Sequence, residues 1–281
     1  MPTYTTPTPL DLAIDVQVGT IEVVASERGD TVVTVSPTSP AKPTDHRGAE
    51  GTTVELDGQR LTIATPKPRF TLLGPSESVD VRVELPTGSR LAAQITLGTV
   101  RTTGRLGATR VKASAGGADL DVTGDLWVRA GHGSVSVEAA DGDVEITADH
   151  GQIRLGRVAG DALLKASHGS VRIEEVSGQL EVKLSYGDLE VDRALGPVVA
   201  KTAYGSIQLH EVGTGPVEAG SGYGEVGVGV RAGVPVWLDL SSKIGRVRNE
   251  LEADVAPSDP EQALAVRART GFGDITVRRV A

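Results

Sequence analysis

The chain has 281 residues, of which 35 are glycine and none is cysteine, and its formal net charge is −9. The acidic balance argues against binding along a nucleic-acid backbone, which needs a basic footprint. The lack of cysteine excludes a disulfide framework and a thiolate metal site. Because 39% of the residues are hydrophobic and only 3% are aromatic, the core must be built from Val, Ile, Leu and Ala in narrow layers.

The first third is expected to form β-structure without a clean repeat. Apolar and polar residues alternate over residues 12–24, which is the period of a half-buried strand. Shorter strand-like runs follow at residues 31–35, 53–56, 61–64 and 79–85. The polar stretch at residues 36–51 lies between them and is predicted to be a mobile loop.

The sequence shows no targeting or membrane-spanning pattern. The start, MPTYTTPTPLDLAIDVQVG, lacks a basic region followed by an apolar stretch. Nowhere do about 18 apolar residues run together. We therefore expect a cytoplasmic protein without a membrane segment.

From about Leu91 the sequence repeats. Two interleaved series of glycines each recur every eighteen residues: Gly133, Gly151, Gly169, Gly187 and Gly205, and Gly124, Gly142, Gly160, Gly178 and Gly196. Apolar residues two and four positions after each glycine predict a strand with one face inward, and the glycine supplies a tight corner. Each coil thus carries two strands and two corners. Stacking of such coils predicts an all-β fold, a parallel β-solenoid with coils of about 18 residues.

After Tyr223 the repeat loosens. Residues 244–247 and 272–277 echo it at longer spacing and are expected to form irregular last coils, with the polar linker 254–262 as a surface excursion. The sequence therefore predicts three regions. They are an N-terminal β-rich cap with the first strands at 1–90, regular coils at 91–229, and irregular C-terminal coils with a cap at 230–281.

Three stretches carry a resemblance to a known family. They are VDVRVELPTGSRLAAQITLGTV at residues 79–100, the run of coils that begin with glycine and Asp or Ser, and the closing VWLDLSSKIGRV and VRARTGFGDITV. Over about residues 79–279, and more weakly over the N-terminal part, the chain resembles the bacterial DUF4097 family of "putative adhesin" β-solenoid proteins. The resemblance implies the fold, and it brings no catalytic motif with it.

A residue with a ring precedes each glycine of the first series and recurs toward the C-terminus. The positions are His132, His150, His168, Tyr186, Tyr204, Tyr223 and Phe272. One coil apart in register, these rings would stack at a corner as a structural spine, for which no metal or cofactor is expected. Two alternatives stay open. The three histidines could bind zinc or copper, or they could sense pH, because stacked imidazolium groups repel below about pH 6.5.

A second row is basic. Lys165, Lys183 and Lys201 occupy the same repeat position, and Arg129 and Lys112 extend the row. Like charges one strand apart are unfavourable unless they are offset, and the glutamates at positions 145 and 181 lie two residues away on the same outward face. A solvated face with local ion pairs is the main interpretation. The alternative is a ligand face for an anionic polymer or lipid headgroup.

Catalytic and calcium-binding motifs are not matched. The segment Gly220–Gly224 contains a glycine-flanked serine but lacks the strand and helix of a nucleophile elbow. Calcium-binding β-rolls need G-G-x-G-x-D repeats, of which only the fragment Gly116–Asp119 is present. We expect a protein without catalytic residues.

The sequence therefore favours a non-enzymatic scaffold or protein-interaction β-solenoid of bacterial type, which binds an unknown protein partner or itself. The rival hypothesis is binding, less plausibly processing, of an anionic glycan or polymer along the row of three lysines. Open sheet edges at the ends of a solenoid lead to filaments unless they are capped. Because residues 1–90 and 254–262 are long enough to cap both ends, we expect a monomer or small oligomer.

Overall fold

Most of the chain is β-strand. The computed structural model describes residues 2–66, 77–251 and 264–280. It divides into two compact units, Met1–Asp141 and Gly142–Ala281, called unit 1 and unit 2 below. The three regions predicted from the sequence, with borders after residues 90 and 229, stay a prediction.

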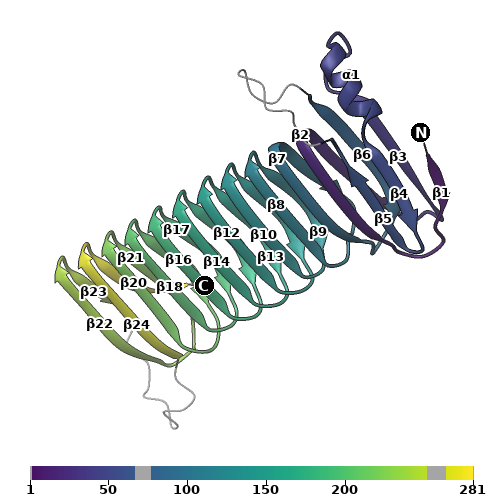
Figure 1. Ribbon diagram of the computed structural model, residues 1–281. Helices are drawn as coiled ribbons and strands as arrows, with labels where there is room; N and C mark the ends of the chain where they lie inside the picture. The colour runs from purple at the N-terminus through teal and green to yellow at the C-terminus, as the bar shows by residue number, and fades with distance from the viewer. Residues whose placement is uncertain (1, 67–76, 252–263, 281) are drawn as a thin grey trace. The chain divides into compact units, whose positions relative to one another are not determined.

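The described elements of unit 1 are β1 (Thr3–Thr5), β2 (Asp11–Ser26), β3 (Asp30–Pro37), α1 (Pro43–Glu50), β4 (Thr53–Asp57), β5 (Arg60–Ala64), β6 (Val79–Pro86), β7 (Arg90–Thr103), β8 (Thr109–Ala115), β9 (Ala118–Thr123), β10 (Leu126–His132) and β11 (Val135–Ala140) (Figure 1). Those of unit 2 are β12 (Val144–His150), β13 (Ile153–Val158), β14 (Ala162–His168), β15 (Val171–Val176), β16 (Leu180–Tyr186), β17 (Leu189–Ala194), β18 (Val198–Tyr204), β19 (Ile207–Val212), β20 (Val217–Tyr223), β21 (Val226–Arg231), β22 (Val236–Ile244), β23 (Val247–Glu250), β24 (Leu264–Phe272) and β25 (Ile275–Val280).

Both units are parallel β-solenoids, which confirms the predicted fold. In unit 2, β14 pairs in parallel with β12 and β16, and β15 pairs in parallel with β13 and β17. Each coil thus contributes one strand to each of two series. Partners in successive coils are 18 residues apart, as in Val144 with Ala162 and Ala162 with Leu180. The period of the sequence is therefore the length of a coil.

Alternate residues of each strand point into the coil and form columns of apolar side chains. Ile146, Leu164, Val182 and Ala200 follow one another in such a column, and each has 0% exposure. Fully burying a Val or Leu side chain stabilises by roughly 1.5–3 kcal/mol. A single coil cannot bury its residues, so the columns form only when coils stack.

The two glycine series occupy two different corners. In the first series φ is positive: 144° at Gly133, 137° at Gly151, 138° at Gly169, 147° at Gly187 and 146° at Gly205. A Cβ on Gly187 would lie 2.0 Å from the carbonyl oxygen of Gly169, one coil away. Of the second series, Gly178 has no positive φ, but its Cβ would lie 2.5 Å from the oxygen of Gly160. Conformation and close approach require glycine at the first corner, and close approach alone requires it at the second.

Carboxylates that follow the glycines join neighbouring coils. Oδ1 of Asp143 accepts a hydrogen bond from the backbone N–H of Asp161 at 2.9 Å, and Oδ1 of Asp161 accepts one from Gln179 at 2.7 Å. At the other corner, Oδ1 of Asp188 accepts one from Ser206 at 2.7 Å. The glycine-Asp pattern of the repeat therefore places hydrogen-bond acceptors on corner amides that would otherwise lack partners.

The stacking order of the coils differs from their order in the sequence. In unit 1, β2 pairs in parallel with β5 and β6 on one side and with β7 on the other. In unit 2, β24 lies between β20 and β22, and β25 lies between β21 and β23. The strand β2 in unit 1 and the strands β24 and β25 in unit 2 are thus inserted one coil inward, where they have sheet partners on both sides (Figure 1).

Antiparallel strands cover the outer edge of unit 1. β4 pairs with β5, and β3 pairs with β6 and β1. The prediction of a mobile loop at residues 36–51 was wrong, because β3 extends to Pro37 and α1 follows. The helix starts at Pro43, and the buried carboxylate of Asp45 accepts hydrogen bonds from the backbone N–H groups of Ser39 and Ser78. Proline in the first turn and an acidic residue after it were the missed signals.

The last coil of unit 2 is formed by β22 and β23. Within the described residues each pairs on one side only, β22 with β24 and β23 with β25. All four residues of β23 are exposed, as are four of the nine in β22. The predicted linker at residues 254–262 lies outside the described residues.

Candidate functional site

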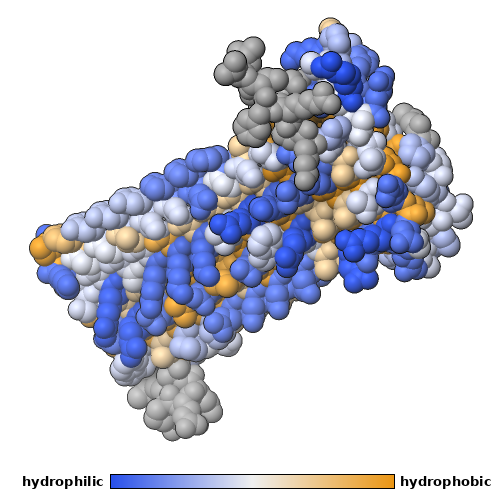
Figure 2. Space-filling model, in the orientation of Figure 1, coloured by the Kyte–Doolittle hydropathy of each residue, from blue (hydrophilic) through white to orange (hydrophobic). Residues whose placement is uncertain are grey.

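Outward-pointing side chains form rows from coil to coil. Parallel strands in register place the same repeat position about 4.8 Å apart in neighbouring coils. Figure 2 shows these rows as bands of hydrophilic side chains on the visible face. In unit 2 the outer surface offers a hollow, a basic row and a stack of rings.

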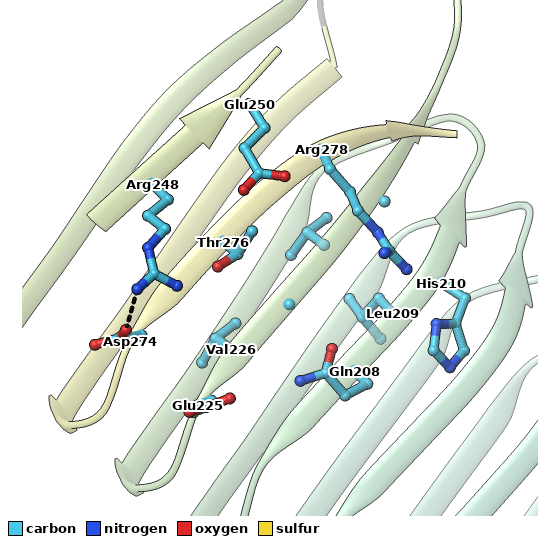
Figure 3. Close-up of a pocket in the computed structure, with 13 residues that line it drawn as sticks. Gln208, Leu209, His210, Glu225, Val226, Arg248, Glu250, Asp274, Thr276 and Arg278 are labelled. Carbon is cyan, nitrogen blue, oxygen red and sulfur yellow. Dashed lines mark ion pairs between the residues drawn. The ribbon is translucent and has the colours of Figure 1, made fainter. Parts of the chain in front are cut away.

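The hollow has a volume of about 310 Å³ and lies over β21, between β19 and β25 (Figure 3). It forms where β21 carries Gly227 and Gly229. A Cβ on Gly229 would lie 1.9 Å from the backbone carbonyl oxygen of His210, so glycine is required there, whereas a Cβ on Gly227 would displace only the end of the Gln208 side chain. The polar side chains around it are Gln208, His210, Glu225, Arg248, Glu250, Asp274, Thr276 and Arg278.

The charges around the hollow are partly paired. Nη2 of Arg248 lies 3.2 Å from Asp274, and Nε2 of His210 lies 3.1 Å from Oε1 of Glu190. Arg278 makes no ion pair within 4 Å among the described residues. The hollow is therefore suited to a small polar or carboxylate group that a partner inserts from outside.

Beside the hollow, Glu190, Asp192 and His210 converge, with their ligand atoms all within 4.8 Å of one another. Both carboxylates already face Arg172, whose Nη1 lies 2.8 Å from Glu190 and whose Nη2 lies 3.5 Å from Asp192. An arginine in this position supplies the positive charge that a metal ion would bring. The set is an ion-pair network of partly exposed residues.

The three lysines of the predicted basic row are direct neighbours on adjacent strands. Lys165 pairs in register with Lys183, and Lys183 pairs with Lys201. Nζ of Lys183 lies 2.6 Å from Glu181, and Nζ of Lys201 lies 2.8 Å from Glu218. The lysine hydrogen bond lowers the pKa of each of these carboxyl groups. The lysine–lysine repulsion is thus offset locally.

A groove of about 250 Å³ runs beside this row. It is lined by Lys165 and Lys183 and by the hydroxyl groups of Thr147, Ser167 and Ser185. Lys165 makes no ion pair within 4 Å among the described residues, unlike its two neighbours. Two ammonium groups next to three hydroxyl groups form a surface that can accept an anionic group.

The ring residues of unit 2 form a continuous stack. It comprises His150, His168, Tyr186, Tyr204, Tyr223 and Phe272, with centroids 4.6 to 4.9 Å apart and interplanar angles of 2 to 7°. The tyrosines remain 46 to 49% exposed. Because each ring covers the face of the next, the stack offers edges and hydroxyl groups to solvent, and no inner ring has a free face for a sugar.

In unit 1 the corresponding positions are less uniform. His132 pairs in register with Ala115, and Arg129 pairs with Lys112. The guanidinium of Arg110 lies 4.7 Å from the ring centroid of Trp127, a cation–π contact. Arg129 and Lys112 therefore form a basic pair within unit 1, and Lys165, Lys183 and Lys201 form a row within unit 2.

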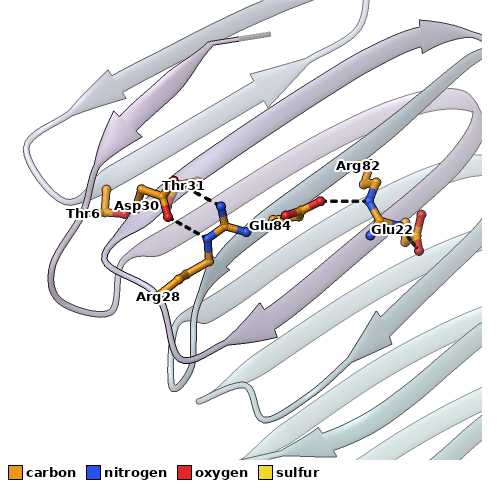
Figure 4. A network of polar contacts seen from close by, with 7 residues as sticks. All are labelled: Thr6, Glu22, Arg28, Asp30, Thr31, Arg82 and Glu84. Carbon is orange, nitrogen blue, oxygen red and sulfur yellow. Dashed lines mark hydrogen bonds and ion pairs between the residues drawn. The ribbon is translucent and has the colours of Figure 1, made fainter.

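A charged network lies on the outer face of β2, β3 and β6 in unit 1 (Figure 4). Arg28 bonds Asp30 at 2.9 Å and Glu84 at 2.5 Å, and Arg82 bonds Glu22 at 2.5 Å. The hydrogen bond from Arg28 is the main cause of a lowered pKa in both Asp30 and Glu84. This network holds the antiparallel strand β3 to the parallel coils.

Sequence reasoning missed the hollow over β21. Its signal is the pair of glycines at 227 and 229, which stand at outward strand positions where earlier coils carry polar or charged residues. His210 reaches the hollow from β19, the sequential neighbour of β21, whereas Arg278 reaches it only because β25 is inserted beside β21. No spacing between residues near in sequence predicts that β25 is inserted there.

Among the described residues, no helix has the length and apolar character needed to cross a membrane.

Comparison with solved structures finds similar chains at low identity. They are a "putative cell adhesion protein" from Clostridium sporogenes (11% identity, 98% of this chain and 94% of that chain covered, TM-score 0.21), a "putative adhesin" from Bacteroides fragilis (13%, 99% and 95%, 0.35) and a "putative lipid binding protein" from Parabacteroides distasonis (13%, 100% and 96%, 0.26). At these identities and TM-scores, the similarity gives no information about the activity of this chain. No curated protein matches the chain.

The family assignment rests on the sequence itself. The family model described as Toastrack DUF4097 matches residues 10–243, which is most of the chain. This range covers the inserted strand β2, the regular coils and β22 up to Lys243. It includes the N-terminal part, over which the motifs carry the resemblance only weakly. The chain is a member of the Toastrack DUF4097 family.

Proposed function

We propose that this protein is a non-enzymatic scaffold whose outer coil faces bind a macromolecular partner. The observation that carries the proposal is the uninterrupted register from β12 to β19, in which coils of constant length present the same outward positions in straight rows. Such rows give a flat, ribbed surface that a second macromolecule can cover. Both surface hollows of unit 2 described above are open and polar, which suits contact with side chains of a partner.

Two half-buried apolar residues mark where such a partner would lie. Leu163 and Val199 point outward beside the lysine row, each two positions before a lysine. Mixed apolar and charged surface is typical of the contact area of non-obligate complexes. A photoreactive amino acid at either position should therefore give discrete adducts in the native cell, whereas the same group at Glu55 on β4 should not.

The adduct must then be tested with purified components. The partner identified from it should bind the full chain, and the double variant L163E/V199E should lose at least about tenfold in affinity. The matched control places two glutamates at Gln152 and Ser170, at the corners before β13 and β15 and outside both hollows. The proposal fails if no outward position gives a discrete adduct, or if both double variants bind equally well.

A second candidate function is binding of an anionic polymer along the lysine row. It is favoured by the groove in which Lys165 and Lys183 lie next to three hydroxyl groups. Heparin and polyphosphate are suitable probes. The triple variant K165Q/K183Q/K201Q should abolish retention at physiological salt, whereas R154Q/R157Q/R193Q, with the same change in charge, should retain it. Equal loss in both triple variants would indicate a non-specific charge effect.

A further inference from the structure

The last coil of unit 2 ends in an open sheet edge. Within the described part of the chain, β22 and β23 have no strand on their outer side. β22 has nine residues and includes Trp237 and Ile244, which are 54% and 62% exposed. A long apolar edge strand is a template for pairing with another strand.

The core column is also incomplete at this edge. Leu238 and Leu240 point inward but stay half-buried, whereas their partners Val266 and Ala268 on β24 have 0% exposure. Figure 2 shows hydrophobic atoms at this edge. A further layer of strands would bury these side chains in the same way as in every inner coil.

The backbone of β22 is poised for such a layer. The carbonyl of Pro235 accepts a hydrogen bond from the N–H of Leu264, so the odd-numbered residues of β22 face β24. In a parallel pair alternate residues bond to the same neighbour. Leu238, Leu240 and Ser242 therefore turn their N–H and C=O groups to the open side.

The geometry limits what can pair there. The outer edge of unit 1 is occupied by β3 and β4, so stacking of one chain's open edge on the other unit of the next chain is blocked. Two copies of the same edge can pair about a two-fold axis that runs across the coil, with β22 antiparallel to β22 and β23 antiparallel to β23. Such a contact closes at two chains.

The charges of both strands are self-complementary about that axis. With Ser241 opposite itself, Asp239 lies opposite Lys243 of the second copy. With Asn249 opposite itself, Arg248 lies opposite Glu250. Opposite charges directly across an antiparallel pair are favourable.

One axis can serve both strands. Ser241 lies three residues before Ile244, and Asn249 lies three residues after Arg246, so the two centres are equally far from the corner that joins β22 to β23. The same register sets Trp237 opposite Gly245, where the indole meets no side chain. Inside the chain, Arg267 and Arg269 hold Asp239 in place at 3.0 and 3.3 Å.

We propose that β22 and β23 form a self-recognition edge, through which two copies of this chain join in a closed two-fold dimer. This inference deepens the proposed function, since it names a second copy as one partner and leaves the coil faces free for another. The experiments below use the full 281-residue chain.

A single cysteine tests the register. The protein has no cysteine, so S241C places one thiol at the two-fold axis, where Cα atoms of the non-hydrogen-bonded pair lie about 4.5 Å apart, within disulfide range. Mild oxidation should give a disulfide-linked species of two chains. R269C, on the adjacent inner strand, is the control, because its two thiols would be about three strand spacings, roughly 14 Å, apart.

Charge reversal tests the complementarity. K243E places a glutamate opposite Asp239 twice per dimer and should weaken the dimer by about tenfold or more. K165E, with the same change in charge on an inner strand, should not. The proposal is overturned if S241C and R269C form disulfide-linked dimers equally well. It is also overturned if the chain stays monomeric because another partner or its own segment covers the edge. Such a result would leave the face adducts at positions 163 and 199 unaffected, so the two proposals fail separately.

Discussion

Units 1 and 2 are built from the same kind of parallel coil, but the sheet edge is covered by further strands in unit 1 and uncovered among the described residues in unit 2. In unit 1, the edge strands β5 and β6 are covered by antiparallel β4 and β3, and the charged network around Arg28 fastens β3 in place. In unit 2, β22 and β23 have no such cover among the described residues. Leu61 and Ile63 of β5 accordingly have 0% exposure, whereas Leu238 and Leu240 of β22 are half-buried.

The difference shows that the repeat does not determine how a solenoid ends. Coils supply the same corners, columns and hydrogen bonds throughout, but each end needs its own device to satisfy the last strand. In unit 1 the antiparallel strands β3 and β4 of the same chain cover the edge. The edge of unit 2 keeps the properties of a binding surface. Substitutions in the two units can therefore separate what the coil contributes from what the edge contributes.

The largest effect is expected at the corners, where both units should respond alike. G116A in unit 1 and G187A in unit 2 each place a Cβ within about 2 Å of a carbonyl oxygen, at a positive φ of 134° and 147°. Each should cost about 3 kcal/mol or more. Urea unfolding can be followed in each unit by its own tryptophan, Trp127 or Trp237.

The control for these variants is G220A. Its Cβ would meet only Cγ of Lys201 at 3.9 Å, and its φ is not positive. Its free energy of unfolding should change by less than about 1 kcal/mol. If G187A were as mild as G220A, the corner would not depend on glycine in the way described above.

The next largest effect should separate the two edges. L61A removes a fully buried side chain at the edge of unit 1 and should cost about 3 kcal/mol. L238A removes a half-buried one at the edge of unit 2 and should cost about 1 kcal/mol when measured at concentrations where the protein is monomeric. Equal losses would mean that the edge of unit 2 is covered as well as that of unit 1.

A smaller effect is expected in the stack of rings. Tyr204 stacks on Tyr186 at 4.8 Å and on Tyr223 at 4.9 Å. Y204A should cost about 1–2 kcal/mol in unit 2, whereas Y204F should be nearly neutral, because the ring contacts remain. On β7 of unit 1 the same corner position is held by Leu97, which is 48% exposed, and L97A should cost less than Y204A. A large loss in Y204F would show that the hydroxyl group, rather than the stack, is what matters.

The smallest effect is a pH dependence of the unit 1 edge. The hydrogen bond from Arg28 lowers the pKa of Asp30 and Glu84. Their contribution is therefore fully present above the carboxyl pKa of the unfolded chain, about 4, and is lost as the pH falls through the lower folded value. The urea midpoint reported by Trp127 should fall between about pH 5 and pH 2, and less steeply in R28Q. R60Q, which alters an arginine of β5 without an ion pair among the described residues, should keep the wild-type slope.

The sequence predicted the coil well because the coil is local. Glycines eighteen residues apart and the apolar residues after them specify corners and inward faces without reference to distant segments. The lysine row and the stack of rings follow from the same register, so the sequence predicted that the residues of each would be neighbours in adjacent coils. The helix α1 was missed because its eight residues lack an apolar periodicity.

The parts that could not be predicted depend on which segment lies beside which. The insertion of β24 and β25 one coil inward places Arg278 across the hollow from His210 and leaves β22 at the edge. Segments 236–250 and 264–280 carry similar repeat patterns, so the pattern alone allows either order. The choice depends on how completely each coil is buried, which is a property of the packed unit.

Sedimentation equilibrium of the full-length protein over a wide concentration range tests the open edge of unit 2 most directly. A reversible equilibrium between one and two chains, shifted toward one chain by K243E but not by K165E, is the predicted result. A single-chain mass at every concentration would mean that the edge does not recognise itself. Continued growth beyond two chains would mean that the contact does not close, and it would contradict the two-fold pairing of β22 and β23.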